Sequence, residues 1–195
     1  KRFDIPVTEK DAEELNFYKP DEDSEELVYL RQRREALGGY LPSRDFELEK
    51  FNIPKLEVFK PLLGSSGKKE MSSTKAFVRF LSLLIRDKEL GPRVVPIVPD
   101  EARTFGMEGL FRQMGIYSSS GQLYEPEDSD TVMWYKEDIK GQVLQEGINE
   151  AGAISDWIAA ATSYASHNVT MIPFYIYYSK FGFQRVGDLA WAAGD

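Results

Sequence analysis

The sequence predicts an α/β fold in which a parallel sheet is flanked by helices. From Ser72 onward, stretches with apolar residues three and four apart alternate with short apolar or β-branched runs, an order typical of parallel sheets. Residues 141–195 continue this order with a strand, a helix and a second strand. Charge is sparse in that stretch and is confined to Glu146, Glu150, Asp156, Lys180, Arg185, Asp188 and Asp195.

Composition excludes several classes of site. The chain has 195 residues, a formal charge of −8, no cysteine and a single histidine, His167. The charge argues against a nucleic-acid partner, and the missing cysteines exclude disulfides and thiolate chemistry. One histidine excludes a multi-histidine metal site. No apolar run approaches the roughly 18 residues of a membrane span, and the first residues do not begin a signal peptide, so we expect a cytoplasmic protein without membrane contact.

Residues 1–70 have the character of a connector. Prolines at 6, 20, 42, 54 and 61 interrupt regular structure there. One helix is predicted, with Ser24 as its N-cap, acidic residues in its first turn, arginines in its last and Gly38 and Gly39 at its end. Residues 64–69 form a predicted Gly/Ser/Lys loop.

The elements of the sheet region follow in order. Ser72 or Ser73 caps a helix, and residues 94–98 form a strand even though Pro96 disfavours one. Residues 106–114 form a short helix, and residues 118–130 form a polar loop that we expect to be mobile. The predicted apolar face of the first helix consists of Phe77, Phe80, Leu81, Leu84 and Ile85.

The last elements carry most of the apolar residues. Residues 143–144 are the centre of a strand, and an alanine-rich helix follows through Ala165. Residues 171–178 form a further strand, apolar on both faces as a central parallel strand is. Residues 191–195 leave an apolar surface without cover, so we interpret the chain as a piece of a larger protein.

Polar residues are predicted to gather at the carboxyl edge of the sheet, where open α/β folds bind ligands. The candidates are Asp100 with Glu101, Glu146 with Glu150, and residues 177–183. Each has a purely structural alternative. Glu150 would only stabilise the first turn of its helix, and Tyr178 and Phe181 would belong to a core or an interface. Asp100, Glu101 and Arg103 would form an ion-pair cluster, and His167 would cap a helix end. The chain contains no phosphate-binding glycine loop and no nucleophile elbow.

Four strings resemble one family together. They are ALGGYLPSR at 36–44, DEARTFGMEGLFRQ at 100–113, QVLQEGINE at 142–150 and MIPFYIYYSKFGFQRVGDLAWAAGD at 171–195. In this order they resemble the homodimeric bacterial pyruvate dehydrogenase, the thiamine-diphosphate-dependent decarboxylating component of the pyruvate dehydrogenase complex.

The resemblance implies a domain assignment and partners. Residues 1–70 correspond to the connector and residues 71–195 to the first half of the middle domain, which binds the aminopyrimidine of thiamine diphosphate. The diphosphate and Mg²⁺ would be held by a domain outside this chain, and the site would lie between the subunits of a homodimer. The substrate would be pyruvate, the acetyl group would pass to lipoyl groups of dihydrolipoyl acetyltransferase, and this chain alone would be inactive.

The resemblance also implies roles for individual residues. Glu150 corresponds to the glutamate that bonds a pyrimidine ring nitrogen and relays a proton into the cofactor. Phe181 corresponds to the stacking aromatic ring, Ile148 to the apolar wedge that holds the cofactor bent, and Tyr178 to a tyrosine near bound substrate. Glu101 corresponds to an acidic residue close to the cofactor. Apolar surroundings of Glu150 are expected to raise its pKa.

Two other functions remain open at this point. Another transketolase-like thiamine enzyme would share the combination of a glutamate and a later aromatic residue, although residues 100–113 favour pyruvate dehydrogenase. A non-catalytic dimerisation or assembly module is the alternative from a different class. The apolar composition of residues 141–195 would suit a subunit interface equally well.

Overall fold

The computed structural model describes residues 5–39, 47, 50–127 and 135–194. The chain divides into two compact units, Lys1–Arg44 and Asp45–Asp195. The domain boundary predicted after residue 70 stays a prediction. Within the described ranges, no helix is long and apolar enough to cross a membrane.

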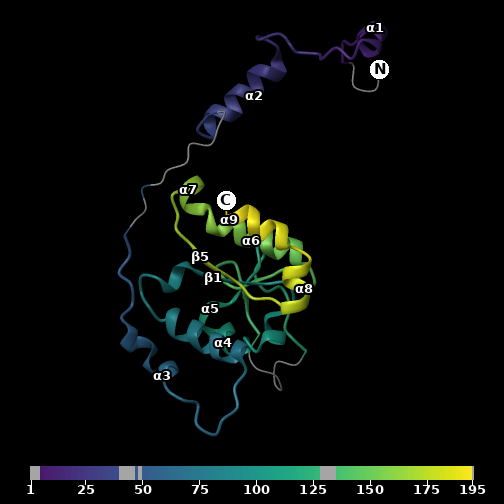
Figure 1. Cartoon of the computed structure of the whole chain (residues 1–195). Coiled ribbons are helices and arrows are strands. Elements are labelled where there is room, and N and C mark those ends of the chain that lie inside the picture. The colour runs from purple at the N-terminus through teal and green to yellow at the C-terminus, as the bar shows by residue number, and fades with distance from the viewer. Residues whose placement is uncertain (1–4, 40–46, 48–49, 128–134, 195) are drawn as a thin grey trace. The chain divides into compact units, whose positions relative to one another are not determined.

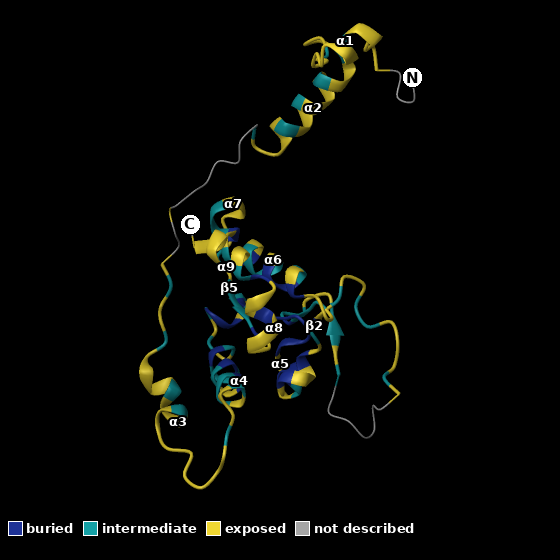
Figure 2. Ribbon diagram, turned by 45° about the vertical axis from the view of Figure 1, so that its right-hand side comes forward, coloured by how far each residue is buried: buried dark blue, intermediate teal, exposed yellow. Residues whose placement is uncertain are grey.

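The first unit consists of two helices without buried residues, α1 (Glu9–Glu13) and α2 (Glu25–Ala36). The prediction for α2 is confirmed, because the Ser24 side chain accepts a hydrogen bond from the Leu27 amide and Gly38 and Gly39 follow its end with positive φ. Helix α1 was not predicted. It begins with a reciprocal capping box between Thr8 and Asp11, and Figure 2 shows both helices largely exposed.

The second unit begins with short helical turns that pack on a longer helix. They are the 3₁₀ turn η1 (Leu56–Phe59) and α3 (Lys60–Leu63), followed by α4 (Ser73–Leu84). Ser72 caps α4 by accepting from the Lys75 amide, as predicted. Leu81 and Leu84 are buried and Phe77 and Phe80 pack against the core, which confirms the predicted apolar face.

The sheet confirms the predicted α/β class. Strand β1 (Val94–Val98) lies between β4 (Leu144–Gln145) and β5 (Ile172–Tyr175), and both pairings are parallel. A short 3₁₀ turn, η2 (Gly91–Arg93), leads into β1. The prediction that residues 171–178 form a central strand was wrong, because β5 is shorter and lies at an edge of the described sheet. Its apolar character comes from helices and side chains packed on both of its faces.

Pro96 is tolerated in the middle strand because of the direction in which its nitrogen points. The Val98 carbonyl accepts a hydrogen bond from the Glu146 amide, on the β4 side, and the Ile97 carbonyl accepts one from the Ile176 amide, on the β5 side. Because the backbone polar groups of a strand alternate between its two edges, the nitrogen of Pro96 points to the β4 side, like the carbonyl of Val98. The β4 ladder begins only opposite Ile97. Before that point the side-chain amide of Gln142 donates to the carbonyls of Gly91 and Val94 instead, so the missing N–H of Pro96 disrupts no ladder bond.

Short elements follow β1 in the described residues 102–127 and 135–138. The helix predicted at 106–114 is replaced by two shorter elements, the 3₁₀ segment η4 (Glu108–Leu110) and helix α5 (Phe111–Met114), and a further 3₁₀ segment, η3 (Ala102–Phe105), precedes them. Strands β2 (Ile116–Tyr117) and β3 (Glu137–Asp138) form a separate parallel pair. Residues 118–127 contain no helix or strand, and residues 128–130 of the predicted mobile loop lie outside the described residues.

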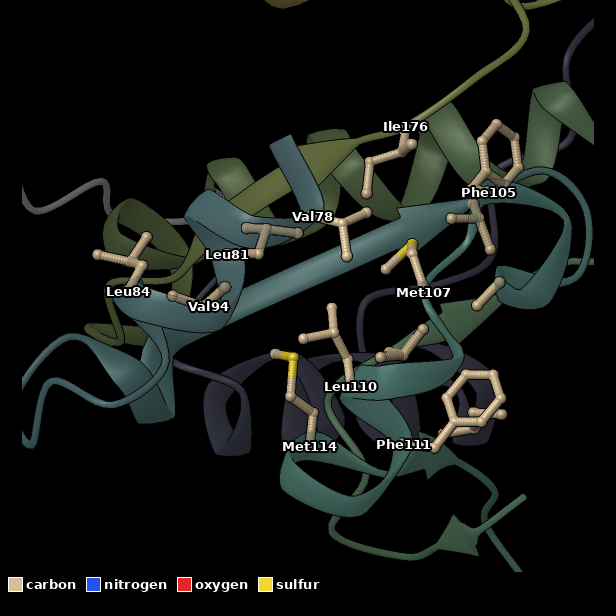
Figure 3. Close-up of a cluster of buried hydrophobic side chains, with 14 of the residues drawn as sticks. Val78, Leu81, Leu84, Val94, Phe105, Met107, Leu110, Phe111, Met114 and Ile176 are labelled. Atoms are coloured by element: carbon tan, nitrogen blue, oxygen red, sulfur yellow. The ribbon is translucent and has the colours of Figure 1, made fainter. Parts of the chain in front are cut away.

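Helices cover both faces of the sheet. Helix α4 and the turns at 102–114 lie on one face, where the main core forms around Val94 and Val98 (Figure 3). Helix α6 (Glu150–Ala161) packs on the other, followed by α7 (Ser163–His167), α8 (Ser179–Gln184) and α9 (Gly187–Gly194), as Figure 1 shows. His167 ends α7, and Asn168 caps it in a left-handed conformation with φ of 53°.

Candidate functional site

Glu150 occupies the junction that the sequence predicted, between the end of β4 and the start of α6. The chain turns there through Gly147, whose φ is 63°. The Asn149 side chain then caps α6 by accepting from the Gly152 amide at 3.0 Å. Glu150 is the first residue of the helix, where a negative charge is stabilised by the helix dipole, and it is only 8% exposed.

Arg185 is the charge partner of Glu150. One guanidinium nitrogen, Nη1, lies 2.8 Å from both carboxylate oxygens. The same guanidinium lies over the Phe181 ring, with Cζ 4.7 Å from the ring centroid. Phe181 lies in α8 and Arg185 directly follows it, so one short helix brings a cation and an aromatic ring to the start of α6.

The expected rise in the Glu150 pKa was wrong. The hydrogen bond from Arg185 is the largest influence, and it holds the pKa of the Glu150 carboxyl below its usual value. The apolar residues that were expected to enclose the carboxylate do not do so, since Ile148 is 83% exposed and Ala151 and Phe181 are exposed as well. Glu150 is therefore an ionised acceptor in this structure.

A second polar pair joins the residue before α8, Tyr178, to the turn after β1. The Tyr178 hydroxyl donates to Asp100 Oδ2 at 3.0 Å, and the Tyr178 ring stacks on Phe105 with centroids 4.7 Å apart. Asp100 Oδ1 accepts from the backbone amide of Glu101. Gln145 Oε1 accepts from the Ala102 amide at 2.6 Å, which ties this turn to the end of β4.

The structure brings some of the predicted site residues together and leaves others apart. Glu150 and Phe181 share Arg185, and Tyr178 binds Asp100. Ile148 and Glu101 are exposed, and the Glu101 side chain makes no hydrogen bond to another described residue. Sequence reasoning missed Arg185 and Gln145. Only Arg185 had a signal, because it follows Phe181 by four residues and such a pair meets on one helix face.

Glu146 forms a separate carboxyl pair with Asp156. Hydrogen bonding to Asp156, then burial and the like charge, raise the pKa of Glu146 to about 7. The Glu146 carboxyl is also close to α6, since a Cβ added at Gly152 would lie 3.0 Å from Glu146 Oε2. The two carboxylates of the junction, Glu146 and Glu150, are thus shifted in opposite directions.

This pair predicts how stability depends on pH. The folded state holds the Glu146 proton more tightly than the unfolded chain, so its contribution is complete below pH 4.5 and is lost as the pH rises through about 7. We expect Tm to fall between pH 5 and pH 8, and to fall less in Asp156→Asn, as measured by circular dichroism. Asp188→Asn, an exposed carboxylate in α9, is the matched control. Equal pH slopes in wild type and Asp156→Asn would contradict the shared proton.

An apolar cavity of about 300 Å³ lies between α6, β5, α8 and α9. Tyr175 and Tyr177 line it from β5 and the residues that follow, stacked with centroids 4.7 Å apart. Burial raises the pKa of Tyr175 to about 12, and its hydroxyl is buried without a partner among the described residues. The remaining lining residues are Ile154, Trp157, Pro173, Phe174, Gly182, Phe183, Val186 and Ala190.

Comparison with known proteins assigns the family. Residues 51–195 match the family model of the pyruvate dehydrogenase E1 component middle domain. The whole chain aligns with proteins named pyruvate dehydrogenase E1 component, at 66% identity in Pseudomonas aeruginosa, 59% in Cupriavidus necator and 57% in Escherichia coli K12. The chain spans 22% of the length of each of these relatives. The match over residues 51–195 shows that the chain belongs to the family of the pyruvate dehydrogenase E1 component middle domain.

Proposed function

We propose that this chain forms one wall of the thiamine diphosphate site of a pyruvate dehydrogenase E1 component. That enzyme would decarboxylate pyruvate oxidatively and transfer the acetyl group to lipoyl groups. One observation carries the proposal. A nearly buried carboxylate, Glu150, lies beside the aromatic ring of Phe181 at the carboxyl edge of a parallel sheet, and the two are connected through Arg185.

The side chains present fit the aminopyrimidine half of the cofactor. Such a ring needs a carboxylate for a ring nitrogen, an aromatic face for stacking and an apolar support. Glu150, Phe181 and the exposed Ile148 offer these three contacts. Thiamine diphosphate, when bound, supplies the electron sink for decarboxylation. Its diphosphate and Mg²⁺ would be held by a domain outside this chain.

Arg185 determines what Glu150 can do. While one guanidinium nitrogen bonds both oxygens, the carboxylate stays ionised and only accepts hydrogen bonds. A proton relay through Glu150 therefore requires Arg185 to release at least one oxygen. Release would weaken the interaction that lowers the pKa, and the carboxyl group would then hold a proton more readily. Arg185 also covers part of the Phe181 ring, so its displacement would free that face for stacking.

The second polar pair is proposed to face the substrate. Tyr178 would lie near bound pyruvate, with its hydroxyl oriented by Asp100. Glu101, which follows Asp100, would lie close to the cofactor. Because Gln145 holds the Ala102 amide, the turn with both carboxylates is fixed to the strand that leads to Glu150.

The proposed assembly and location follow from the same family. The site would lie between the subunits of a homodimer, and the partner enzyme would be dihydrolipoyl acetyltransferase in the multienzyme complex. Residues 1–70 would be the connector and residues 71–195 the first half of the pyrimidine-binding domain. The proposed compartment is the cytoplasm.

Cofactor affinity tests the proposal through Phe181. In the full-length protein, Phe181→Leu is expected to weaken thiamine diphosphate binding by about two- to tenfold, since an aromatic stack contributes roughly 0.5–1.5 kcal/mol beyond its area. The measurement is quenching of intrinsic fluorescence during cofactor titration. The control is Phe183→Leu, an exposed phenylalanine of the same helix, which is expected to leave the affinity unchanged. Equal effects of both variants would remove Phe181 from the cofactor site.

The assembly module stays a second candidate because of the apolar surface near α9. Trp191 is 73% exposed, and the aromatic cavity lies between the same helices. If residues 141–195 served only assembly through this surface, substitutions of Glu150 would leave turnover unchanged.

A further inference from the structure

Positive charge is concentrated in one segment of this acidic chain. Residues 50–88 contain only three acidic residues, Glu57, Glu70 and Asp87, although the formal charge of the chain is −8. Such asymmetry within one compact unit indicates a surface that attracts negative partners. The basic residues of the segment are Lys50, Lys55, Lys60, Lys68, Lys69, Lys75, Arg79, Arg86 and Lys88.

The structure exposes every one of these bases. They lie before and at the start of η1, on α3, in the loop to α4, on α4 itself and in the turn after it. Figure 2 shows the loop between α3 and α4 largely exposed. Lys75 and Arg79 follow each other along one face of α4, opposite the buried Leu81 and Leu84, and Arg86 lies in the turn directly after the helix. No described residue forms an ion pair with any of the nine, so their charge is not neutralised within the described part of the chain.

Two of the arginines border a groove between α3 and α4. Its volume is about 200 Å³ and its lining combines an apolar part, formed by Pro61, Leu62 and Leu83, with a polar part, formed by Arg79, Ser82 and Arg86. We call these six residues the basic groove. Leu56 in η1 and Leu63 in α3 are further exposed apolar residues of these turns, with exposed fractions of 65% and 60%. The apolar lining distinguishes this groove from a charged surface that only contacts solvent, because clustered exposed apolar residues are typical of interaction sites.

We propose that the basic groove binds an acidic, amphipathic peptide segment of a partner protein. Carboxylates of that segment would pair with Arg79 and Arg86, whose guanidinium groups suit bidentate contacts, and its apolar side chains would pack on Leu62 and Leu83. The groove lining contains no aromatic ring on which a base would stack, and the rest of the chain is strongly acidic, so a peptide is favoured over a nucleic acid. The inference does not depend on the role of Glu150.

A binding experiment with the full-length protein tests this surface. The probe is a fluorescein-labelled synthetic peptide composed of Glu, Asp and Leu, and the measurement is fluorescence anisotropy at low and at physiological salt. Wild type is expected to bind with an affinity that falls as salt rises. Arg79→Glu/Arg86→Glu is expected to weaken binding about tenfold or more, because two attractive contacts become repulsive.

Matched variants separate the groove from general charge effects. Lys10→Glu/Lys140→Glu makes the same change in net charge at two exposed lysines outside the groove and is expected to change the affinity less than about twofold. Leu62→Ser is expected to weaken binding without changing its salt dependence. If the reversed arginines impair folding by circular dichroism, Arg79→Gln/Arg86→Gln replaces them, with a smaller loss expected.

Three outcomes would overturn the proposal. The first is equal affinity of the groove variant and the control variant. The second is tighter binding of a single-stranded RNA of equal charge than of the peptide, which would assign the surface to nucleic acid. The third is no binding to wild type at low salt, which would mean that other parts of the full-length protein cover the groove.

Discussion

Replacing Glu150 by Gln in the full-length protein is expected to lower pyruvate decarboxylation by roughly 10²–10⁴-fold, the usual contribution of a positioned acid or base. Gln keeps the size of the side chain and still accepts from Arg185, so the start of α6 is expected to remain folded. It cannot hold and return a proton at the position of the carboxylate. The measurement is decarboxylation with an artificial electron acceptor, alongside the oligomeric state by analytical ultracentrifugation.

The neighbouring carboxylate provides a matched control. Glu146→Gln makes the same chemical change four residues earlier, at a group that pairs with Asp156 and not with Arg185. Near-normal turnover is expected for this variant. If Glu150→Gln also retained near-normal turnover, the proton relay would be refuted. If Glu150→Gln lowered the fraction of dimer but left the turnover per dimer unchanged, the assembly module would become the better explanation.

Sequence patterns predicted those elements whose ends are determined locally. Helices α2 and α4 begin after Ser24 and Ser72, and in both cases the serine accepts the backbone hydrogen bond that the pattern predicts. Helix α1 was missed because it is short and lies in a proline-containing acidic stretch, although Thr8 and Asp11 form a capping box. The capping hydrogen bonds of the two serines thus made the starts of α2 and α4 predictable.

The position of β5 in the sheet was not predictable from its composition. Apolar residues on both faces of a strand indicate that other groups pack on both faces. They do not indicate that a neighbouring strand pairs with each of its two edges. Ile172 and Phe174 contact the core under α4, whereas Tyr175 and Pro173 line the cavity under α6 and α9. The covering groups are helices distant in the sequence, so an edge strand acquired the composition of a central one.

The candidate site was predicted only in part, because some of its contacts also come from segments that are distant in the sequence. Glu150 stands at a strand-to-helix junction that the local sequence defines, and it was identified. Its partner Arg185 lies 35 residues later in the sequence, at the end of α8, and Asp100 and Tyr178 are 78 residues apart. Without these contacts, the sign of the Glu150 pKa shift was predicted incorrectly, since the partner outweighs the burial.

The alignment of the site also depends on a close backbone contact at Gly141. A Cβ added there would lie 2.3 Å from both the carbonyl carbon and the oxygen of Ile116 and 2.5 Å from the Tyr117 nitrogen. These are backbone atoms of β2, which cannot rotate away. The contact places Gln142 where its side chain reaches the carbonyls of Gly91 and Val94, immediately before β4 pairs with β1.

Gly141→Ala is therefore expected to destabilise the domain by about 3 kcal/mol or more, at the upper end of overpacking effects. This corresponds to a Tm lower by roughly 6 °C or more, measured by scanning calorimetry of the full-length protein. Gly109→Ala is the matched control, because a Cβ there meets no atom within 4 Å and φ is not positive, so little change is expected. A Gly141→Ala protein with wild-type Tm would show that Gly141 does not approach the backbone of β2 this closely. On heating of Gly141→Ala, turnover is expected to fall at a lower temperature than the unfolding transition, since β4 leads directly into the turn that positions Glu150.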